Sequence, residues 1–593
     1  MIEKAHRTID DLYLIKGRGH LVVIVLQVPL KESPLTAQKQ RFLTAMCALW
    51  MVIGMTTVAF AQEAAPKGLP MPSDGFSSDV QYRLRSVRID PLEINGTNVT
   101  KMNWTEQRLR LNARYIQAGI GSVNIQLDAL DGVLFGDNGR FLGSPSSNSG
   151  VSLSTRRPNL TRWRVGLPAG GDAVEKKDYA PVLAPVDPIE VNFAYADILL
   201  PIGLLRVGRQ PLAYGPNLAA HDGGDYNRFG VSQFNDTADR ILFGTKLDEG
   251  YYAITKGKDH IPNTSLDSGL VFAMFYDFLK QDVPHVGDDD LRQMGGTIEY
   301  RRGQANWFGL DWRDMVLGLR LVHLRNDRFN SRIWSFPTLL KMSVEKLDLQ
   351  MQYVHIRGET REISEGFGGL TNSAVVDQQL KAHGFQALVD YSLGPVTFTL
   401  EFDYASGDDD PRPSTPITSY NYARDLNVGL LMFEHILAFE SARSTAVGIE
   451  NLEGKETASF PLTEVSTEGR FTNAVAIFPQ LFVRYVDNDN HKLWSRFGVL
   501  MAWPQAAGGV VDPIITALNE DGERIDDDAV NFHGGKPGDY YGTEIDIQLG
   551  WKYKKHFEWV VEGAYLFPGS SLQDANGDAV NSYLLENRFV FNF

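Results

Sequence analysis

The last residues of the chain, Tyr583–Phe593 (YLLENRFVFNF), alternate between two kinds of side chain. One parity is mainly apolar, with Tyr583, Leu585, Phe589, Phe591 and Phe593, and Asn587 is its polar member. The other parity carries Glu586, Arg588 and Asn592, with Leu584 and Val590 as its apolar members. Because successive side chains of a strand point to opposite faces, this period of two predicts a strand with one face suited to hydrocarbon and the other to water.

A chain that ends on such a strand with an aromatic residue resembles the closing strand of bacterial outer-membrane β-barrels. The resemblance implies that the apolar set ending in Phe593 serves as an assembly signal, which the barrel-assembly machinery would read. An ordinary terminal strand of a soluble sheet is the alternative, and the rest of the chain has to decide between the two.

Similar segments recur along the chain and predict a sheet of about eighteen strands. The candidates before Tyr583–Phe593 are Val80–Asp90, Gln107–Gly119, Ser122–Leu130, Glu190–Leu200, Gly203–Gly215, Ala238–Lys246, Leu270–Phe278, Met294–Arg301, Met315–Arg325, Ile333–Val344, Lys346–Arg357, Lys381–Ser392, Val396–Ser406, Ala474–Val486, Leu493–Trp503, Thr543–Tyr553 and His556–Phe567. An even strand number is typical of single-chain bacterial barrels.

The connections between these segments separate by length. Short turns fall on the side of the C-terminus, at Pro201–Gly203, Val344–Glu345, Leu393–Pro395, Asp487–Asn490 and Lys554–Lys555. Long connections fall on the other side, at Gly132–Ile189, Leu212–Thr237, Asp408–Asn473 and Pro504–Gly542. Outer-membrane barrels combine short periplasmic turns with long extracellular loops. We therefore predict an all-β, antiparallel, up-and-down transmembrane barrel over residues 79–593, integral to a bacterial outer membrane.

Bulk composition agrees with this class. The net charge of −16 and the pI near 5.3 exclude a nucleic-acid-binding protein, which needs a basic surface. Mean hydropathy is only −0.20, but alternating strands average their two faces. After Gln62 no apolar stretch approaches the roughly 20 residues of a membrane helix, so a membrane can be crossed only by strands.

The N-terminal region predicts a targeting segment. Gln38–Arg41 is a basic start, Phe42–Val58 an apolar h-region, and Ala59–Ala61 a small-residue cleavage site. Residues 1–61 are thus expected to be an N-terminal extension plus a cleaved signal peptide, followed by a periplasmic segment at 62–78. The stretch before Leu35 is explained by an upstream start-codon miscall, or alternatively by an uncleaved anchor. The single cysteine, Cys47, would leave with the signal peptide.

Asn427–Ser441 (NVGLLMFEHILAFES) does not fit the strand series, because counting it as a strand would invert every later loop. We predict an amphipathic helix or hairpin inside the long loop, packed on the rim or folded into the lumen.

Charged residues on the inward parity are the candidate solute contacts. The basic ones are Arg83, Arg85, Arg108, Arg110, Arg114 and Arg588, which would form one wall where the last strand meets the first. The acidic ones are Glu401, Asp403, Glu544, Asp546, Glu558 and Glu562. Two interpretations stay open: opposed walls that create a transverse field and favour acidic solutes, or charges that pair with each other and hold the barrel open or plugged.

A further resemblance lies in Leu204–Gly215 (LLRVGRQPLAYG) and Phe234–Phe243 (FNDTADRILF). These stretches resemble the alginate-export and related substrate-specific porins through Arg206, Gly208, Arg209, Gln210, Tyr214, Gly215, Asp239 and Arg240. Tyr404–Asp408 is similar to the strand-to-loop junction of that family. The resemblance implies an eighteen-stranded barrel that conducts acidic polysaccharides or small anions. The insertion after Asp408 departs from the pattern and argues against alginate itself.

No hydrolase, metalloprotease or phosphate-loop motif is found, so we expect no enzyme, no catalytic residue, no cofactor and no metal centre. The acidic loops Gly407–Asp410, Asn519–Asp528 and Asp574–Asp578 could hold Ca²⁺, although a solvated rim explains them as well. Two functions remain: a passive, selective channel for polar or anionic solutes, or a plugged barrel that acts as a surface scaffold within a larger envelope complex. Expected partners are outer-membrane lipid and lipopolysaccharide, the assembly machinery, the solute and, for the scaffold alternative, other envelope proteins.

Overall fold

The computed structural model describes residues 74–94, 101–136, 189–216, 218–224, 227–232, 236–257, 268–278, 291–362, 364–365, 374–408, 415–424, 426–441, 467, 469–506 and 529–593, together with a few short backbone stretches elsewhere. The chain divides into two units, Met1–Ala65 and Pro66–Phe593. In the first unit only the paired strands β1 (Ile2–Lys4) and β2 (Tyr13–Ile15) are described. The predicted signal peptide lies outside the described residues.

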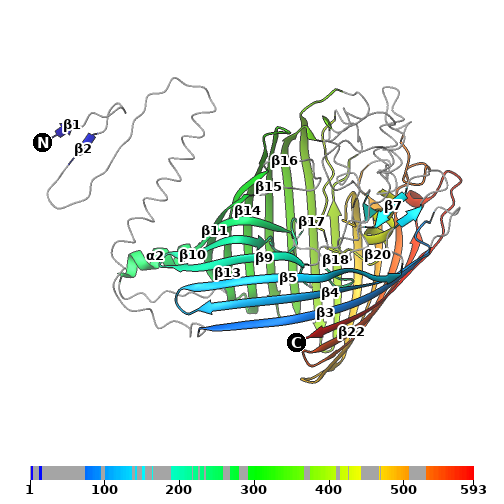
Figure 1. Ribbon diagram of the computed structural model, residues 1–593, viewed down its shortest axis with the longest axis horizontal. Coiled ribbons are helices and arrows are strands. Elements are labelled where there is room, and N and C mark those ends of the chain that lie inside the picture. The colour runs from blue at the N-terminus through cyan, green and yellow to red at the C-terminus, as the bar shows by residue number, and fades with distance from the viewer. Residues whose placement is uncertain are drawn as a thin grey trace. The chain divides into compact units, whose positions relative to one another are not determined.

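The second unit contains a closed antiparallel barrel of eighteen strands (Figure 1). The strands are β3 (Gly75–Asp90), β4 (Met102–Gln117), β5 (Gly121–Gly136), β9 (Ile189–Leu200), β10 (Gly203–Pro211), β11 (Thr237–Lys246), β12 (Gly269–Phe278), β13 (Arg292–Trp307), β14 (Leu310–Asn326), β15 (Ser331–Val344), β16 (Leu347–Thr360), β17 (Gln378–Leu393), β18 (Val396–Ala405), β19 (Ala474–Asp487), β20 (His491–Pro504), β21 (Gly542–Tyr553), β22 (Phe557–Pro568) and β23 (Ser582–Asn592). Each overlaps one predicted segment, so the fold class is confirmed.

The barrel closes where β23 pairs with β3, and Figure 1 shows the red C-terminal strands beside the blue β3. The register sets Arg588 opposite Arg85 and Phe589 opposite Leu84. Backbone bonds between Val80 and Phe593 in both directions, at 3.2 and 2.9 Å, extend the ladder to the last residue. The expected neighbourhood of Arg588 and Arg85 across the closing seam is therefore confirmed. The role of the last strand as an assembly signal stays a prediction.

Apolar side chains point outward and polar ones inward over the middle of the wall. On β14, Leu317, Leu319 and Leu321 are 60, 48 and 39 % exposed, whereas the inward Arg320 between them is 7 % exposed. The same alternation places Ile547 and Leu549 of β21 outside. The outer face is thus a continuous apolar band of the kind that hydrocarbon covers.

The two rims differ in their connections. At the rim that holds the C-terminus (the C-terminal rim), two-residue turns join β9 to β10, β15 to β16 and β17 to β18. One connection at this rim is an exception to the predicted short turns, because helix α2 (Leu247–Lys256) follows β11 there. At the opposite rim, β14 and β15 are joined by the short stretch 327–330. The four connections that were predicted to be long are also long in the structure.

Strand ends depart from the predicted bounds where the alternation fades. β13 extends to Trp307 and β14 begins already at Leu310. They are joined by a turn at Phe308–Gly309 in which both residues have positive φ. Positive φ at both turn positions is typical of two-residue hairpins. Conversely, β10 ends at Pro211 rather than Gly215, because proline has no N–H for the ladder.

Two of the long connections fold into the barrel interior. We call residues 212–236, between β10 and β11, the first inner loop, and residues 415–441, between β18 and β19, the second inner loop. The second contains a helical turn at Met432–Leu437 that continues to Ser441, which confirms the predicted helix and places it inside the barrel. Of the other long loops, most of 137–188 and 507–528 lies outside the described residues. No helix among the described residues is long and apolar enough to span a membrane.

The second inner loop packs in an apolar core inside the barrel. Leu431, Met432, Ile436 and Phe439 are each at most 1 % exposed. The wall contributes inward apolar residues from strand ends at the opposite rim, namely Val87, Ile89, Trp104, Phe478, Leu500, Leu566 and Leu584. The barrel interior is therefore apolar near this rim and charged deeper in.

Candidate functional site

The candidate solute contacts on the basic wall come from β3, β4 and β23, as their parity predicts. Arg83, Arg85, Arg108, Arg110 and Arg588 are 3, 1, 2, 7 and 8 % exposed. Arg114, near the C-terminal rim, is exposed. Strand pairing places Arg83 opposite Arg108 and Arg85 opposite Glu106, so the basic side chains form one patch of the inner wall.

Carboxylates are interleaved with these arginines. Arg85 Nη1 lies 3.2 Å from Glu106 Oε1, and Arg85 Nη2 lies 2.7 Å from Glu586 Oε2. Arg588 Nη1 lies 3.3 Å from Glu562 Oε2 and 3.5 Å from Glu586 Oε1. These side chains are at most 10 % exposed, so the ion pairs are screened little by water.

Arg110 is also paired, in bidentate geometry: its Nε and Nη2 donate to Asp128 at 2.7 Å each. Arg108 donates to Gln81 at 3.1 Å. Of the two open interpretations, the geometry at Arg85, Arg110 and Arg588 agrees with paired charges. The sequence analysis did not include Glu106, Glu586 or Asp128 among the site residues, although all three share the inward parity.

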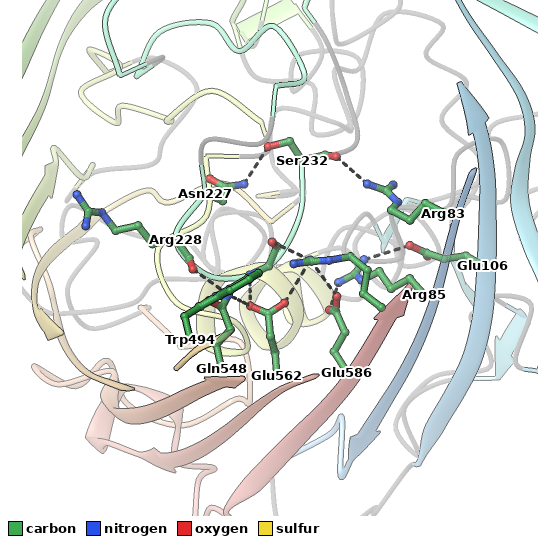
Figure 2. Close-up of polar contacts among 12 residues, drawn as sticks. Arg83, Arg85, Glu106, Asn227, Arg228, Ser232, Trp494, Gln548, Glu562 and Glu586 are labelled. Carbon is green, nitrogen blue, oxygen red and sulfur yellow. Dashed lines mark hydrogen bonds and ion pairs between the residues drawn. The ribbon is translucent and has the colours of Figure 1, made fainter. Parts of the chain in front are cut away.

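The first inner loop is held against this charged patch by hydrogen bonds to its backbone (Figure 2). Arg83 donates to Ser232 O at 3.3 Å, and Arg588 donates to Gly230 O at 3.0 Å. Gly230 N donates to Glu562 at 2.9 Å. Gln548 Nε2 of β21 bridges Glu562 and Arg228 O at 2.8 and 3.1 Å.

Arg228 anchors the first inner loop on another part of the wall. Its guanidinium donates to both oxygens of Asp390 on β17 at 3.0 and 2.9 Å, and to Thr399 of β18 at 3.0 Å. Burial would lower the pKa of Arg228, but the hydrogen bonds and charge of Asp390 raise it above its usual value. The loop therefore spans from β17 and β18 to β3, with a permanently charged anchor at one end.

The second inner loop is held chiefly by Glu544 of β21. The Glu544 carboxylate accepts hydrogen bonds from the backbone N–H groups of Leu430, Leu431 and Met432 at 2.7, 2.8 and 2.6 Å. These N–H groups begin the helical turn, where a negative charge also meets the positive end of the helix dipole. Glu544 was predicted to contact solute; in the structure it is 0 % exposed and caps this helical turn.

The other predicted carboxylates lie at different depths. Glu401 and Asp403 accept hydrogen bonds from Gln480 and Gln386 at 2.7 and 2.8 Å. Asp546 is fully buried two positions from Glu544. Glu558 is partly exposed and pairs with Lys552 at 3.3 Å. These acids do not form a single wall opposite the arginines. Four of the six lie on β21 and β22, next to β23, and only Glu401 and Asp403 lie farther away, on β18.

His435 of the second inner loop is a buried group that the sequence did not reveal. It is 1 % exposed, neither ring nitrogen has a hydrogen-bond partner among the described residues, and its ring lies 6.1 Å from that of Trp104. Burial, and secondly the charge of Arg85, hold the pKa of His435 well below its usual value. The docked loop therefore keeps this imidazole neutral.

Docking of the second inner loop is accordingly expected to weaken in acid. Below about pH 6.5 His435 binds a proton when the loop is undocked but stays neutral when it is docked. Each unit by which the pH falls below this value therefore favours undocking by about 1.4 kcal/mol. Amide hydrogen exchange of Met432–Leu437 at pH 7.5 and 5, corrected for the intrinsic effect of pH, measures this. In His435→Phe the acid sensitivity should disappear; an unchanged response in that variant would contradict the assignment.

Most of the residues that carry the family resemblance connect β10 to its neighbouring strands β9 and β11. Arg206 forms a bidentate pair with Asp197 at 2.6 and 3.0 Å. Gly208 has φ +122°, and a Cβ there would lie 2.4 Å from Ala194 O, so only glycine fits. Gln210 donates to Arg240 O at 2.8 Å.

Further along the same stretch, Tyr214 lies beside Arg320, whose Cζ is 5.6 Å from the ring. Gly215 has φ +64° at the start of the loop. Arg209 differs from the rest, because it is on the outward parity and pairs there with Asp239 at 3.0 Å.

Nothing in the described part of the chain is arranged as a metal centre of three or more His, Cys, Asp or Glu side chains. In the predicted calcium loop 574–578, Asp574 Oδ1 accepts backbone N–H groups from Asn576 and Asp578 at 2.8 and 2.9 Å. Residues 409–410 and 519–528 of the other acidic loops lie outside the described residues.

Comparisons with known proteins find resemblance only in backbone structure. No protein-family model matches the chain, and no curated protein matches its sequence. Pseudomonas aeruginosa OccK2 (OpdF) in complex with glucuronate has a TM-score of 0.41 at 10 % identity, covering 89 % of this chain and 99 % of that chain. Acinetobacter baumannii OccAB1 has a TM-score of 0.44 at 11 % identity, covering 90 % and 99 %.

The outer membrane protein OprD of P. aeruginosa has a TM-score of 0.41 at 11 % identity, covering 89 % and 96 %. The alginate-export part of the sequence resemblance finds no support in these comparisons. Similarity at this level concerns the fold alone.

Proposed function

We propose that this chain is a passive channel of a bacterial outer membrane, with its C-terminal rim in the periplasm and its long loops outside. The observation that carries the proposal is the division of the wall: the outer face is apolar and exposed, while the inner face carries charged side chains that surround two inner loops. A closed barrel with this division crosses a membrane and offers polar solutes a water-compatible interior.

The inner loops make the narrow part of the proposed pathway, and charge near it gives selectivity. The inward arginines at the closing seam are bound to carboxylates and loop backbone, so their main contribution is to shape the pathway. Arg114 at the C-terminal rim is exposed, and the side chains of Arg206 and Arg301 are 30 and 34 % exposed to solvent. These cations favour small polar or anionic solutes that enter the charged interior.

Planar-bilayer recordings of the purified protein test the channel directly. We expect discrete conductance steps and, in a salt gradient, a reversal potential that favours anions. Arg114→Gln should reduce the anion preference without changing the step frequency, because Arg114 is exposed. Lys555→Gln, in a turn of the C-terminal rim, removes one charge outside the pathway and is the control. An unchanged reversal potential in Arg114→Gln would contradict the proposed role of this charge.

The alternative, a plugged barrel that serves as a surface scaffold or envelope subunit, is favoured by one observation. Each residue of Leu430–Phe439 in the second inner loop is at most 4 % exposed, as expected for a permanent plug. A barrel that inserts into bilayers but stays electrically silent at all voltages would establish this alternative and refute the channel.

A further inference from the structure

The outer face of the barrel carries a belt of cations at the opposite rim, over β13–β17. We define this outer basic belt by Arg292, Arg325, Arg332, Arg357 and Lys381. Strand pairing links them in a row, with Arg292 opposite Arg325, Arg325 opposite Arg332, and Arg357 opposite Lys381. They share the outward parity with the exposed Leu317, Leu319 and Leu321, so the belt faces away from the lumen.

Carboxylates neutralise this belt only in part. Asp327 pairs with Arg325 at 2.6 Å and Glu359 with Arg332 at 3.8 Å. Within the described residues no carboxylate lies within ion-pair distance of Arg357 or Lys381. By contrast, the outward cation Arg209 on β10 is matched by Asp239. Among the described residues the belt therefore has more cations than paired carboxylates, on a surface that meets the edge of the membrane in the proposed orientation.

Aromatic and histidine side chains stack beside the cations of the belt on the outer face. His323 stacks on Trp334 with ring centroids 4.2 Å apart, and His355 stacks on His383 at 4.6 Å. Tyr353 Oη lies 2.7 Å from His383 Nδ1. Arg357 Cζ lies 5.4 Å above the ring of Phe336, which leaves the edge of the guanidinium available for an acceptor.

Below the belt, toward the C-terminal rim, the same face is apolar. Leu317 and Leu319 of β14 and Leu347 of β16 are 60, 48 and 38 % exposed. A ligand that fits this surface carries negative groups at one end and hydrocarbon chains at the other. Guanidinium groups pair with phosphate in bidentate geometry, and rings at the interface suit a lipid headgroup region.

We propose that the outer basic belt binds the phosphate groups of a phosphorylated glycolipid of the outer leaflet, whose acyl chains lie on the apolar face of β13–β17. This inference rests on the proposed outer-membrane location. The facing strands β19–β22 offer no equivalent site, because their outward residues near this rim are uncharged, for example Val475, Trp503, Ile545 and Tyr565.

Native mass spectrometry of the full-length barrel in detergent, with bisphosphorylated lipid A as the probe, tests the proposal without requiring channel activity. We expect retention of lipid A over phosphatidylethanolamine, and Arg357→Gln/Lys381→Gln should weaken retention about 25-fold, at about fivefold per charge. Lys346→Gln/Lys555→Gln removes two exposed charges at the C-terminal rim and should bind as the unchanged protein does. Should the first double variant fail to fold, Lys381→Gln with Arg332→Gln replaces it.

Three results would overturn the belt as the site: equal retention by the belt variant, equal binding of dephosphorylated lipid A, or an equal loss in the control variant. Displacement by inorganic phosphate would overturn the lipid as the occupant. Conductance of the belt variant should match that of the unchanged protein, because the belt faces away from the lumen. A silent barrel that still selects phosphorylated lipid would refute the channel and leave the lipid site standing.

Discussion

Replacing Glu544 with alanine is expected to release the second inner loop and to enlarge the channel. The variant removes the one carboxylate that accepts three backbone N–H groups of Leu430, Leu431 and Met432. Leaving these buried donors without their charged acceptor costs about 3–5 kcal/mol of docking free energy. We expect a larger and noisier single-channel conductance, together with protease cleavage within 427–441.

Glu544→Gln should show a smaller effect, since the amide keeps one acceptor oxygen but loses the charge. Glu558→Gln is the matched control, because Glu558 lies on the neighbouring strand, is partly exposed and pairs with Lys552 of β21. Conductance and protease protection that remain unchanged in Glu544→Ala would show that other contacts suffice to dock the loop.

Replacing Arg85 with methionine is expected to cause the largest loss of barrel stability. Arg85 joins Glu106 of β4 and Glu586 of β23 across the closing seam, with all three side chains at most 1 % exposed. Breaking a buried ion pair from one side costs about 3–5 kcal/mol, because the remaining charge stays buried. The temperature at which the detergent-solubilised barrel loses its compact electrophoretic form should fall accordingly.

A second substitution distinguishes charge from packing at this position. Adding Glu586→Gln to Arg85→Met removes a negative charge that Arg85 would have met, so part of the lost stability should return. Arg484→Met serves as the control: its pair with Asp487 is 47 and 39 % exposed and contributes at most about 1 kcal/mol. No recovery in the double variant would mean that the loss arose from packing.

The strands could be predicted from the sequence because their evidence is local. In β21, Ile545, Ile547 and Leu549 alternate with Glu544, Asp546 and Gln548, and this pattern needs no knowledge of the partner strand. Strand ends were less certain, because polar residues beyond the apolar band, such as Gln304 and Asn306 of β13, carry no alternation. Helix α2 was missed because it interrupts a rim where only short turns were expected.

The inward direction of the candidate residues could also be predicted, but their partners could not. Arg85 meets Glu586 only because the last strand pairs with the first, in a register that no local pattern specifies. The first inner loop binds through the backbone atoms of Gly230 and Ser232, which every residue possesses. One signal for the interior core was present: Val87, Ile89, Leu566 and Leu584 are apolar on the inward parity and are expected to meet a buried partner.

The attachment points of the first inner loop also affect the mechanics of the molecule. The loop leaves the wall after β10, yet it is fastened at Asp390 of β17 through Arg228 and to β22, β23 and β3 through Gly230 and Ser232. A closed sheet without internal ties is free to flatten into an ellipse, since that deformation breaks no strand pairing. A tie across the interior opposes this flattening, so the loop keeps the cross-section of the barrel close to one shape.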